Sequence, residues 1–589
     1  MSVAGLQDRW NARAGQLRAG AQVGRALWRT LRQEWGEGTL GSTLAQSRQA
    51  GTVRFADEPS YGELLERCAA RAPTRPFLSF EGRSYSLGEL DERTNVVASG
   101  LASLGLRPGD VVALLCPNVP AFLETFFATQ KLGLGLVPVN TGLKGEGLRH
   151  VLSNSGSRAV IVHRDYWPQL EVVRQSLPDL ASVVVVNEDA RATPPRGVTV
   201  LEDWYATHAG ASSPAVRPDP EAVSLLMYTS GTTGAPKGVV YRYRDTQTKR
   251  LRLLANLLYD PGEVLFTCLP LFHANALLLA AVQALNVDGR LALERRFRAS
   301  RFWEQVTTHG ATSFNALGAM IPILLKQPPG PYDRAHRVRM VVSAACPAHA
   351  WEPFEQRFGT RIVEAYGAVD GGGFVTMNLG NAPVGSIGKP IGGAKYELVD
   401  ARGQPVPVGQ PGELLVWTGA SGTGGVEYYR NEEATRSKTR NGWIHTGDLL
   451  HRDARGFLYF DGRNTDSMRR RGENVSAFEI ESVLDRHPDV LECAVFGVPS
   501  DLGEEDIMAV VVPMEGRTPN PVELRTFLSE HLAAHALPRY WEVLDELPKT
   551  GTHRVQKKEL AARGVTECTW DAETSNVEGG APCVSRSRA

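Results

Sequence analysis

Short apolar runs and longer amphipathic segments alternate through most of the chain, from about residue 61 to residue 461. The apolar runs are rich in β-branched residues, a pattern typical of buried parallel strands, whereas residues 84–105 have helical spacing. Alternation of this kind predicts an α/β fold in which helices wind around parallel sheets. The clearest predicted strands are DVVALLCP (110–117), GLVPVN (135–140), AVIVH (159–163) and SVVVVN (182–187).

The pattern changes toward the C-terminus. Residues 395–417 are strand-like runs punctuated by Pro and Gly, which predicts a small β subdomain. From about residue 462, segments in the order helix, strand, strand, helix, strand predict a separate α+β unit of domain size. We therefore expect a helical N-terminal extension (1–56), a large α/β domain with the β subdomain (57–461), a small mobile domain (462–563) and a disordered polar tail (564–589).

A loop dense in glycine and hydroxyl residues stands out in MYTSGTTGAPKGVVY, residues 227–241. A strand-like run precedes it, and the residues after it have amphipathic, helical spacing. A glycine-rich loop between a strand and a helix N-terminus commonly cradles phosphate, because its backbone N–H groups approach the oxygens closely. Lys237 is followed by Gly238 instead of the Ser or Thr of a P-loop NTPase, which excludes that class. The segment predicts a phosphate loop of another kind.

Composition narrows the classes of function. The chain has 589 residues, of which 42% are hydrophobic and 22% charged, with a formal net charge of -1. This balance is typical of a globular protein of several domains and argues against nucleic acid as a main partner. The 7 cysteines stand far apart without metal-ligand spacing, so we expect reduced thiols and a cytoplasmic protein. No apolar run reaches the ~18 residues that would span a bilayer.

The first fifty residues carry arginines at Arg9, Arg13, Arg18, Arg25, Arg29, Arg32 and Arg48, with RALWRTLRQEW at helical spacing. Such a segment lies on a membrane surface in some proteins. More often it packs on its own domain or on a partner, and that is what we expect here. The sequence leaves the oligomeric state open, with a homodimer as one option.

Seven motifs stand in an order and spacing that resemble the adenylate-forming superfamily of acyl-CoA synthetases, peptide-synthetase adenylation domains and luciferases. The resemblance covers roughly residues 61–560 and is strongest toward carnitine/crotonobetaine-type and fatty-acid-transport-type CoA ligases. The motifs are YTSGTTGAPKG, CLPLFHANAL, VVSAACPAHAWEPFEQRFGTRIVEAYGAVDGG, GELLV, YYRNEEAT with NGWIHTGDLLHRDARGFLYFDGRNTD, RRRGENVSAFEIESVL and LPKTGTHRVQKKEL.

This resemblance implies a reaction in two steps. The carboxylate of a small-molecule acid attacks the α-phosphate of ATP, which gives an acyl adenylate and pyrophosphate. A thiol, usually that of coenzyme A, then displaces AMP. Both steps build up negative charge, so the site needs fixed donors and cations more than an acid–base pair. ATP, Mg2+ and coenzyme A are the implied cofactors and co-substrates.

The resemblance also implies roles for individual residues. The glycine-rich loop would close over the β- and γ-phosphates, Tyr366 would stack on adenine, Asp448 would bind both ribose hydroxyls and Asp370 would hold Mg2+. Cys346 is expected to be pocket wall, because nothing near it in sequence would activate a thiolate. The full implied nucleotide-binding set is Thr229, Ser230, Gly231, Thr232, Thr233, Gly234, Lys237, Ala344, Ala345, Cys346, Glu364, Ala365, Tyr366, Gly367, Asp448, Arg463, Arg470 and Gly472.

The resemblance implies a second set of residues for catalysis and for binding of the acid. Thr229, Lys237, His273 and Arg554 are the implied catalytic residues, with His273 as the gate of the acid pocket or, alternatively, an ordinary core histidine. The acid pocket is expected to include Asn275, Asn315, Gly318 and the glycines 371–373, although either asparagine alternatively ties up backbone. Arg470, Gly472 and Glu473 match the segment that meets the thiol substrate after the small domain rotates.

The sequence departs from the family pattern at four positions. The usual Y-G-x-T-E is replaced by residues 366–370, in which Val369 removes a hydroxyl and Asp370 shortens the Mg-binding carboxylate by one methylene. Thr465 stands where the hinge usually has Asp or Lys. Arg554 occupies the column of the adenylation lysine, and both Val369 and Arg554 border the reacting phosphate.

Three alternatives to an acid–CoA ligase are open at this point. An adenylating enzyme of a natural-product pathway would load a carrier protein or an amine, or activate a non-carboxylate acid such as nitrite, as diazo-forming relatives do. A non-catalytic nucleotide-binding scaffold is disfavoured, because Lys237, Asp370, Asp448 and Arg463 are all retained. Membrane fatty-acid uptake would depend on the basic N-terminus alone.

We predict that Arg554 takes the role of the family's lysine, since its guanidinium keeps the charge and grips two oxygens. Loss of one preorganised charge typically slows a reaction by ~10²–10³. Arg554→Ala should therefore slow ATP–pyrophosphate exchange by that factor while sparing thiol transfer from supplied adenylate. Lys557→Ala is the control; if it abolishes exchange and Arg554→Ala does not, the lysine has shifted in register.

Overall fold

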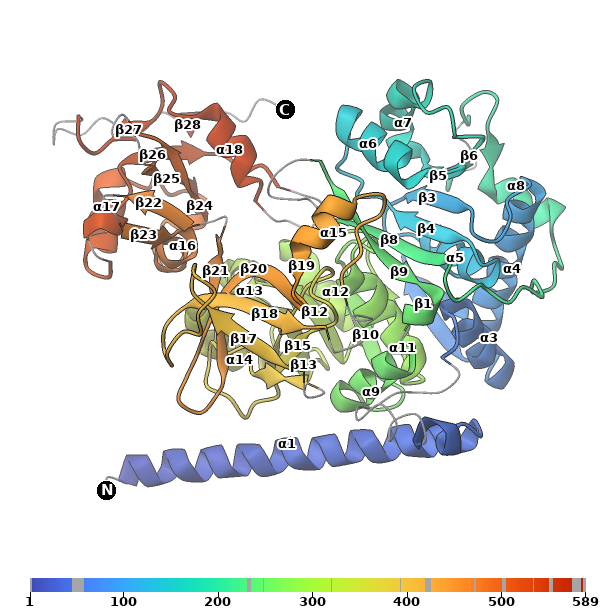
Figure 1. Cartoon of the computed structure of the whole chain (residues 1–589), viewed down its shortest axis with the longest axis horizontal. Coiled ribbons are helices and arrows are strands. Elements are labelled where there is room, and N and C mark those ends of the chain that lie inside the picture. The colour runs from blue at the N-terminus through green and yellow to red at the C-terminus, as the bar shows by residue number, and fades with distance from the viewer. Residues whose placement is uncertain are drawn as a thin grey trace.

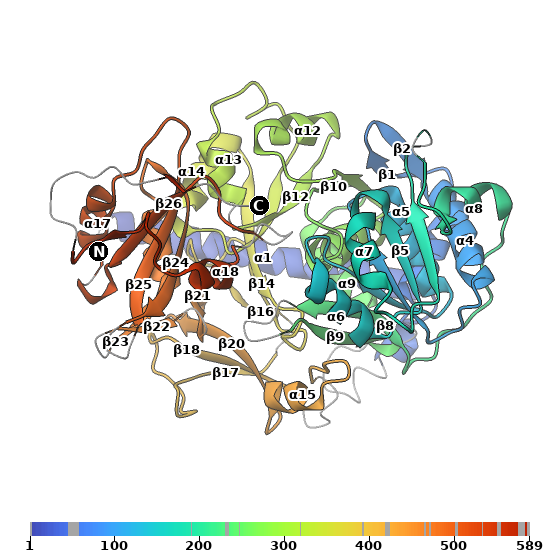
Figure 2. The same cartoon turned by 90° about the horizontal axis from the view of Figure 1, so that it is seen from above.

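A computed structural model describes residues 3–44, 58–189, 191, 193–229, 235–246, 248–318, 320–391, 394–418, 425–464, 467–470, 473–500, 505–532, 534–549, 555–574 and 584–585. Two large sheets lie side by side with helices around them, and a smaller sheet covers one edge of the pair (Figures 1 and 2). The C-terminal unit lies at one end, and one long helix runs along the side of the molecule. The fold is the α/β arrangement that the hydrophobic pattern predicts.

The first large sheet has seven strands in the order β7-β6-β5-β3-β4-β8-β9. Its pairs are parallel except for β8 with β9, which form an antiparallel hairpin. The four clearest predicted strands are confirmed as its centre, β3 to β6. The strands are β3 (Val111–Leu115), β4 (Gly135–Pro138), β5 (Ala159–His163), β6 (Ser182–Val186), β7 (Thr199–Val200), β8 (Val223–Thr229) and β9 (Lys237–Arg242).

The second large sheet has nine strands in the order β16-β15-β14-β13-β12-β10-β11-β1-β2. Its centre is parallel and both edges are antiparallel. The strands are β1 (Pro76–Phe80), β2 (Arg83–Ser86), β10 (Val264–Thr267), β11 (Arg290–Leu293), β12 (Ser313–Leu317), β13 (Met340–Ala344), β14 (Arg361–Gly367), β15 (Val375–Asn378) and β16 (Lys389–Pro390).

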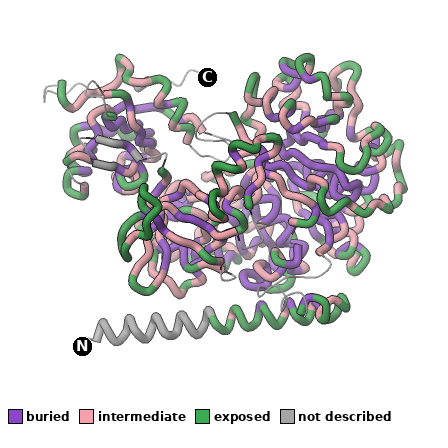
Figure 3. The backbone as a smooth tube through the Cα atoms, viewed as in Figure 1, coloured by how far each residue is buried: buried purple, intermediate pink, exposed green. Residues whose placement is uncertain are grey.

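Helix α5 (Pro120–Lys131) belongs to the common core of the two sheets. Every one of its residues is buried, and Figure 3 shows buried backbone concentrated in the sheets around it. Helix α4 (Leu87–Ser103) follows its N-cap residue Ser86, and the side chains of Ser86 and Glu89 form a capping box. The other helices of this domain are α3 (Tyr61–Arg71), α4 (Leu87–Ser103), α6 (Gly145–Ser155), α7 (Trp167–Arg174), α8 (Leu201–Thr207), α9 (Thr248–Leu258), α10 (Ala274–Ala276), α11 (Val282–Asn286), α12 (Phe302–Thr308), α13 (Met320–Lys326) and α14 (Ala348–Phe358).

The β subdomain contains a five-stranded sheet. Its residues 427–429 pair with the outer edge of β9 and so join the subdomain to the first large sheet. Val240 N donates to Glu427 O at 2.9 Å, and Tyr429 N donates to Gly238 O at 2.8 Å. These bonds give β9 a partner on both sides. The sheet consists of β17 (Tyr396–Val399), β18 (Gly412–Trp417), β19 (Thr439–Arg440), β20 (Trp443–Arg452) and β21 (Leu458–Arg463), with helix α15 (Glu432–Lys438) beside it.

The C-terminal unit has its own apolar core around β24 and β25. Lys326 of α13 reaches it and donates to the carbonyls of Val490 and Leu491 at 2.7 and 2.9 Å. Two short strands from the stretch expected to be a tail pair with β26. The elements are β22 (Ser467–Arg470), β23 (Glu473–Ser476), α16 (Ala477–Leu484), β24 (Val490–Pro499), β25 (Glu505–Pro513), α17 (Pro521–Ser529), β26 (Tyr540–Leu544), α18 (Lys557–Arg563), β27 (Trp570–Asp571) and β28 (Val584–Ser585).

The long helix α1 (Val3–Gly36) packs on α9 (Figure 1). Ala26, Thr30 and Glu34 are buried at this contact. The three lie four residues apart and therefore on one face of the helix. In the described part of the chain, no helix is both long and apolar enough to cross a membrane.

Close packing between β12 and the end of β13 gives a prediction. A Cβ on Gly318 would overlap the carbonyl oxygen of Ala345, a residue expected to line the adenine. Gly318→Ala should therefore displace that backbone, with an overpacking cost of about 1–3 kcal/mol. Thermal unfolding should occur at lower temperature, and the KM for ATP should rise about ten-fold, because 1.4 kcal/mol is a factor of ten.

Gly147→Ala is the matched control, since its Cβ would meet Leu143 at an ordinary 3.4 Å. An unchanged KM for ATP in Gly318→Ala would show that the 345 backbone is not part of the nucleotide site.

Candidate functional site

The glycine-rich loop closes a β-hairpin. Thr229 ends β8, Lys237 begins β9, and Thr229 Oγ1 donates to Lys237 O at 3.4 Å across the base of the loop. The expectation of a strand followed directly by a helix N-terminus is therefore wrong, since β9 intervenes before α9. Lys237, at the start of β9, remains a candidate donor toward a phosphate. Ser230, Gly231, Thr232, Thr233 and Gly234 lie outside the described residues.

A chain of polar contacts runs from Lys237 to the predicted metal ligand. Lys237 Nζ lies 5.6 Å from the ring centroid of Tyr428, a cation–π distance. The hydroxyl of Tyr428 donates to Asp370 Oδ2 at 2.6 Å, and Lys438 Nζ lies 3.1 Å from the same oxygen. Burial would raise the pKa of Asp370, but the charge of Lys438 and the Tyr428 hydroxyl hold the pKa below its usual value. The carboxylate is therefore ionised at neutral pH.

Asp370 suits a metal that also binds phosphate oxygens. Mg2+ usually takes one or two carboxylates together with substrate phosphates, rather than a cage made of protein alone. Among the described residues there is no group of three or more His, Cys, Asp and Glu side chains that would form such a cage. A single ionised carboxylate near the phosphate loop fits this form of binding.

Asp448 combines burial with an unmade hydrogen bond. It pairs with Arg463 in the register of β20 and β21, where its Oδ1 lies 2.9 Å from Arg463 Nε. Tyr366 OH donates to the other oxygen, Oδ2, at 2.6 Å. Within the described residues, Oδ1 is buried and accepts no hydrogen bond. A buried carboxylate oxygen of this kind is ready to accept a hydroxyl of a ligand.

Tyr366 has a second contact that the sequence did not indicate. The predicted stacking on adenine concerned its ring, which lies between Phe374 and Phe460 at centroid distances of 6.3 Å each. Its hydroxyl orients Asp448 at the same time. One residue thereby links the expected adenine and ribose contacts.

Glu364 shapes the backbone at the end of β13. Its carboxylate accepts the N–H groups of Ala345 and Cys346, the latter at 3.2 Å. Ala345 has a φ of 68, which a residue other than glycine adopts only when its surroundings hold it. Burial raises the pKa of Glu364 to about 7, against the opposing effect of these donors. Ala344, Ala365 and Gly367 lie on the same two strands, β13 and β14.

Cys346 is buried, and burial raises the pKa of its thiol. The thiolate is the nucleophilic form of cysteine. The interpretation of Cys346 as pocket wall agrees with this environment.

His273 is the N-cap residue of α10, which leads into a π-helical turn, Leu277–Ala281. Burial lowers the pKa of His273 to about 4, so its imidazole is neutral at pH 7. Its Nε2 is buried and has no hydrogen-bond partner among the residues the structure describes. Asn315 donates to Asn275 Oδ1 at 2.7 Å and to Leu279 O at 3.2 Å, so its amide ties up the neighbouring turn, the alternative left open above.

Arg250 of α9 is a site candidate that the sequence did not reveal. Its Nη1 lies 3.8 Å from the point where a Cβ on Gly373 would stand, beside the glycine turn that follows Asp370. Arg250 is exposed to solvent, yet the surrounding protein lowers the pKa of its guanidinium.

The C-terminal candidates are described only in part. Arg554, Thr465 and Gly472 lie outside the described residues, and Arg470 and Glu473 are described as backbone of β22 and β23. Lys557, the rival of Arg554, pairs with Glu481 at 2.7 Å within the C-terminal unit. Its ammonium group is therefore engaged inside this unit.

Two family models cover most of the chain. The AMP-binding enzyme model matches residues 65–424, and the AMP-binding enzyme C-terminal domain model matches residues 479–554. The chain is 33% identical over 502 residues to the sulfoacetate–CoA ligase of Cupriavidus necator, which covers 84% of this chain and 95% of the relative. It is 31% identical over 497 residues to the crotonobetaine/carnitine–CoA ligase of Salmonella paratyphi A, covering 82% and 95%.

Solved structures of CoA ligases have the same fold. The anthranilate CoA ligase AuaEII in complex with anthranoyl-AMP superposes with a TM-score of 0.76 at 27% identity, over 86% of this chain and 98% of that one. ATP-bound MatB from Rhodopseudomonas palustris gives a TM-score of 0.73 at 25% identity, over 85% and 98%. The chain therefore belongs to the AMP-binding enzyme family and is an AMP-forming ligase of the acyl-CoA synthetase type.

Proposed function

We propose that this ligase activates a small carboxylic acid that carries a second negative charge, and transfers it from AMP to coenzyme A. The observation that carries the proposal is Arg250, whose guanidinium stands beside the glycine turn 371–373. This turn follows Asp370 directly, so a distal group of an acid that reacts near Asp370 is within reach of α9. We also propose that the enzyme is cytoplasmic, in keeping with reduced thiols at the six described cysteines.

The first step needs negative charge stabilised around the α-phosphate. The carboxylate oxygen of the acid forms a bond to the α-phosphorus, and the bond from that phosphorus to the pyrophosphate oxygen breaks. In our proposal Lys237 and the loop hydroxyls bind the leaving pyrophosphate, and Arg554 bridges the acid and the α-phosphate. Mg2+, held by Asp370, would neutralise phosphate charge when bound. Asp448 would fix the ribose through Oδ1, which accepts no hydrogen bond from the described residues.

We propose that the arginine at position 554 compensates for the valine at position 369. Val369 lacks the hydroxyl of most relatives, and its carbonyl accepts the hydroxyl of Tyr241 at 2.9 Å. The Val369 backbone is thereby tied to β9. We propose that the longer guanidinium of Arg554 fills the space that the missing hydroxyl leaves.

The second step transfers the acyl group to a thiol. The thiol sulfur of coenzyme A forms a bond to the acyl carbon, and AMP leaves with the oxygen that came from the carboxylate. We propose that the C-terminal unit rotates between the two steps about the segment near Gly462, where φ is 126. Few residues other than glycine tolerate this conformation. The Lys326 contact with β24 would then be specific to one arrangement of the two units.

The charge at Arg250 distinguishes between the acids of the two relatives. Sulfoacetate, named for the relative from Cupriavidus necator, has a second negative group. Crotonobetaine and carnitine, named for the relatives from Salmonella, carry a cationic group. A guanidinium attracts the former and repels the latter, which favours a dianionic acid for this chain.

We predict that ATP–pyrophosphate exchange is faster with dianionic acids, such as sulfoacetate and malonate, than with butyrate or crotonobetaine. Arg250→Gln should lower kcat/KM for the dianionic acids ten- to hundred-fold, as expected for loss of one charged hydrogen-bonded pair. It should leave kcat/KM for butyrate within a factor of about three. The control is Arg244→Gln, an exposed arginine that pairs with Glu221 on the surface.

Two results would separate the parts of this proposal. Exchange with butyrate or crotonobetaine exceeding that with every dianionic acid would refute the substrate class and leave the ligase chemistry intact. Absence of exchange with all acids, in a protein that still binds ATP, would refute adenylation itself.

A further inference from the structure

The outer face of α1 is an exposed apolar stripe. Val23, Leu27 and Leu31 recur every four residues and are 42%, 43% and 43% exposed. Trp28 and Trp35 extend the same face and are 61% and 75% exposed. Exposed apolar residues are normally scattered singly over a protein surface, whereas a contiguous patch marks a site of interaction.

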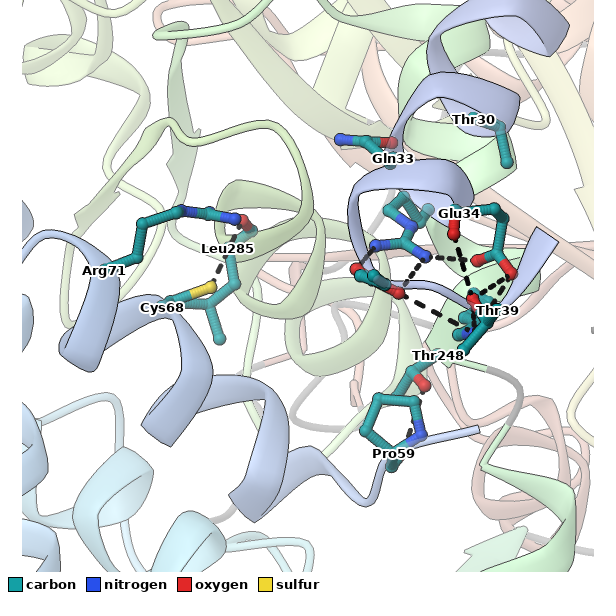
Figure 4. Close-up of polar contacts among 12 residues, drawn as sticks. Thr30, Gln33, Glu34, Thr39, Pro59, Cys68, Arg71, Thr248 and Leu285 are labelled. Carbon is teal, nitrogen blue, oxygen red and sulfur yellow. Dashed lines mark hydrogen bonds and ion pairs between the residues drawn. The ribbon is translucent and has the colours of Figure 1, made fainter. Parts of the chain in front are cut away.

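Contacts with α9 on the neighbouring face, which includes Ala26, Thr30 and Glu34, fix the helix in place. Glu34 is fully buried and pairs with Lys249 Nζ at 3.1 Å and Arg252 Nη2 at 2.7 Å, both from α9 (Figure 4). Thr39 and Thr43 also donate to Glu34, at 2.7 and 2.8 Å. A buried carboxylate with four donors is costly to remove from its partners. These bonds fix the rotation of α1, with the more exposed Trp28 and Trp35 on the side away from the α9 contact.

The orientation of α1 suits a flat surface. Figures 1 and 2 show the helix as a straight rod along one side of the molecule, tangential to the large domain. A membrane-surface helix lies in the plane of the interface with its apolar face down.

Charge indicates what covers the stripe. Residues 3–36 contain Arg9, Arg13, Arg18, Arg25, Arg29 and Arg32 against two acidic residues, Asp8 and Glu34, and Glu34 is neutralised at α9. Arg25 and Arg32 are exposed beside the stripe, and the Arg32 guanidinium lies 5.4 Å from the Trp28 ring centroid. A second copy of this face would bring arginine against arginine. Anionic lipid headgroups would attract Arg25 and Arg32. Tryptophan prefers the membrane–water interface.

We propose that α1 docks the enzyme on the surface of an anionic phospholipid bilayer. Trp28, Leu31 and Trp35 enter the boundary between headgroups and acyl chains, while Arg25 and Arg32 contact the phosphates. The helix lies on the membrane without crossing it. The two family models match from residue 65 onward, so this surface lies outside the part of the chain that defines the family. The proposal does not depend on the identity of the acid.

Vesicle flotation of the full-length chain tests the proposal. The protein should float with vesicles of phosphatidylcholine mixed with phosphatidylglycerol, and much less with phosphatidylcholine alone. Rising salt should weaken binding, because it screens the arginines. Trp28→Ser with Trp35→Ser should reduce binding on the order of ten-fold or more through lost apolar insertion. Arg25→Gln with Arg32→Gln should reduce it by about five-fold per arginine on anionic vesicles only.

The control is Val172→Ser, which removes an apolar side chain on α7 that is 78% exposed. It should float like the wild type, and all variants should keep the thermal unfolding temperature and ligase activity of the wild type. Failure of the wild-type chain to float with anionic vesicles would overturn the proposal. So would sedimentation as a dimer that the tryptophan variant converts to monomers, because the stripe would then be a surface for self-association.

Discussion

The backbone pairing between β9 and residues 427–429 holds the candidate site together. β9 begins at Lys237, so this pairing fixes the base of the phosphate loop to the β subdomain. It also places Tyr428 between Lys237 of β9 and Asp370 of the turn between β14 and β15. Without that pairing, the first large sheet would end at an open edge, and the cation and the carboxylate would have no common neighbour. The arrangement of the two charges that we propose to face the phosphates therefore depends on main-chain hydrogen bonds between distant segments.

Helix α9 links this site with the outside of the molecule. Lys249 and Arg252 face α1 and neutralise the buried Glu34, while Arg250 between them faces the glycine turn beyond Asp370. Helical geometry separates neighbouring residues by about 100° and sends them to different sides. One short helix thus anchors the N-terminal helix and presents a cation to the proposed acid pocket. The ion pairs of Lys249 and Arg252 with Glu34 of α1 therefore help to fix the position of Arg250 on the same helix.

Features that arise from local pattern were predictable from the sequence. β3 to β6 are short apolar runs whose period and length leave little choice, and α4 begins at a Ser with Glu three residues later. The family motifs located Asp448, Arg463 and Asp370 without any structure. What failed was the segment after the loop: β9 is a strand because β8 and the distant residues 427–429 pair with it on either side, and its own pattern gave no sign of this pairing. Arg250, Lys438 and the burial of Glu34 were missed for the same reason, since each depends on contact between segments far apart in sequence.

The central claim is that the carboxylate oxygen of the acid attacks the α-phosphorus of ATP within this array of charges. The direct test uses an acid labelled with 18O in its carboxylate, together with ATP, Mg2+ and coenzyme A, and analyses the products by mass spectrometry. The account predicts one 18O atom in AMP, no label in pyrophosphate, and a thioester that retains the other oxygen. Unlabelled AMP, or label in inorganic phosphate accompanied by ADP, would contradict it.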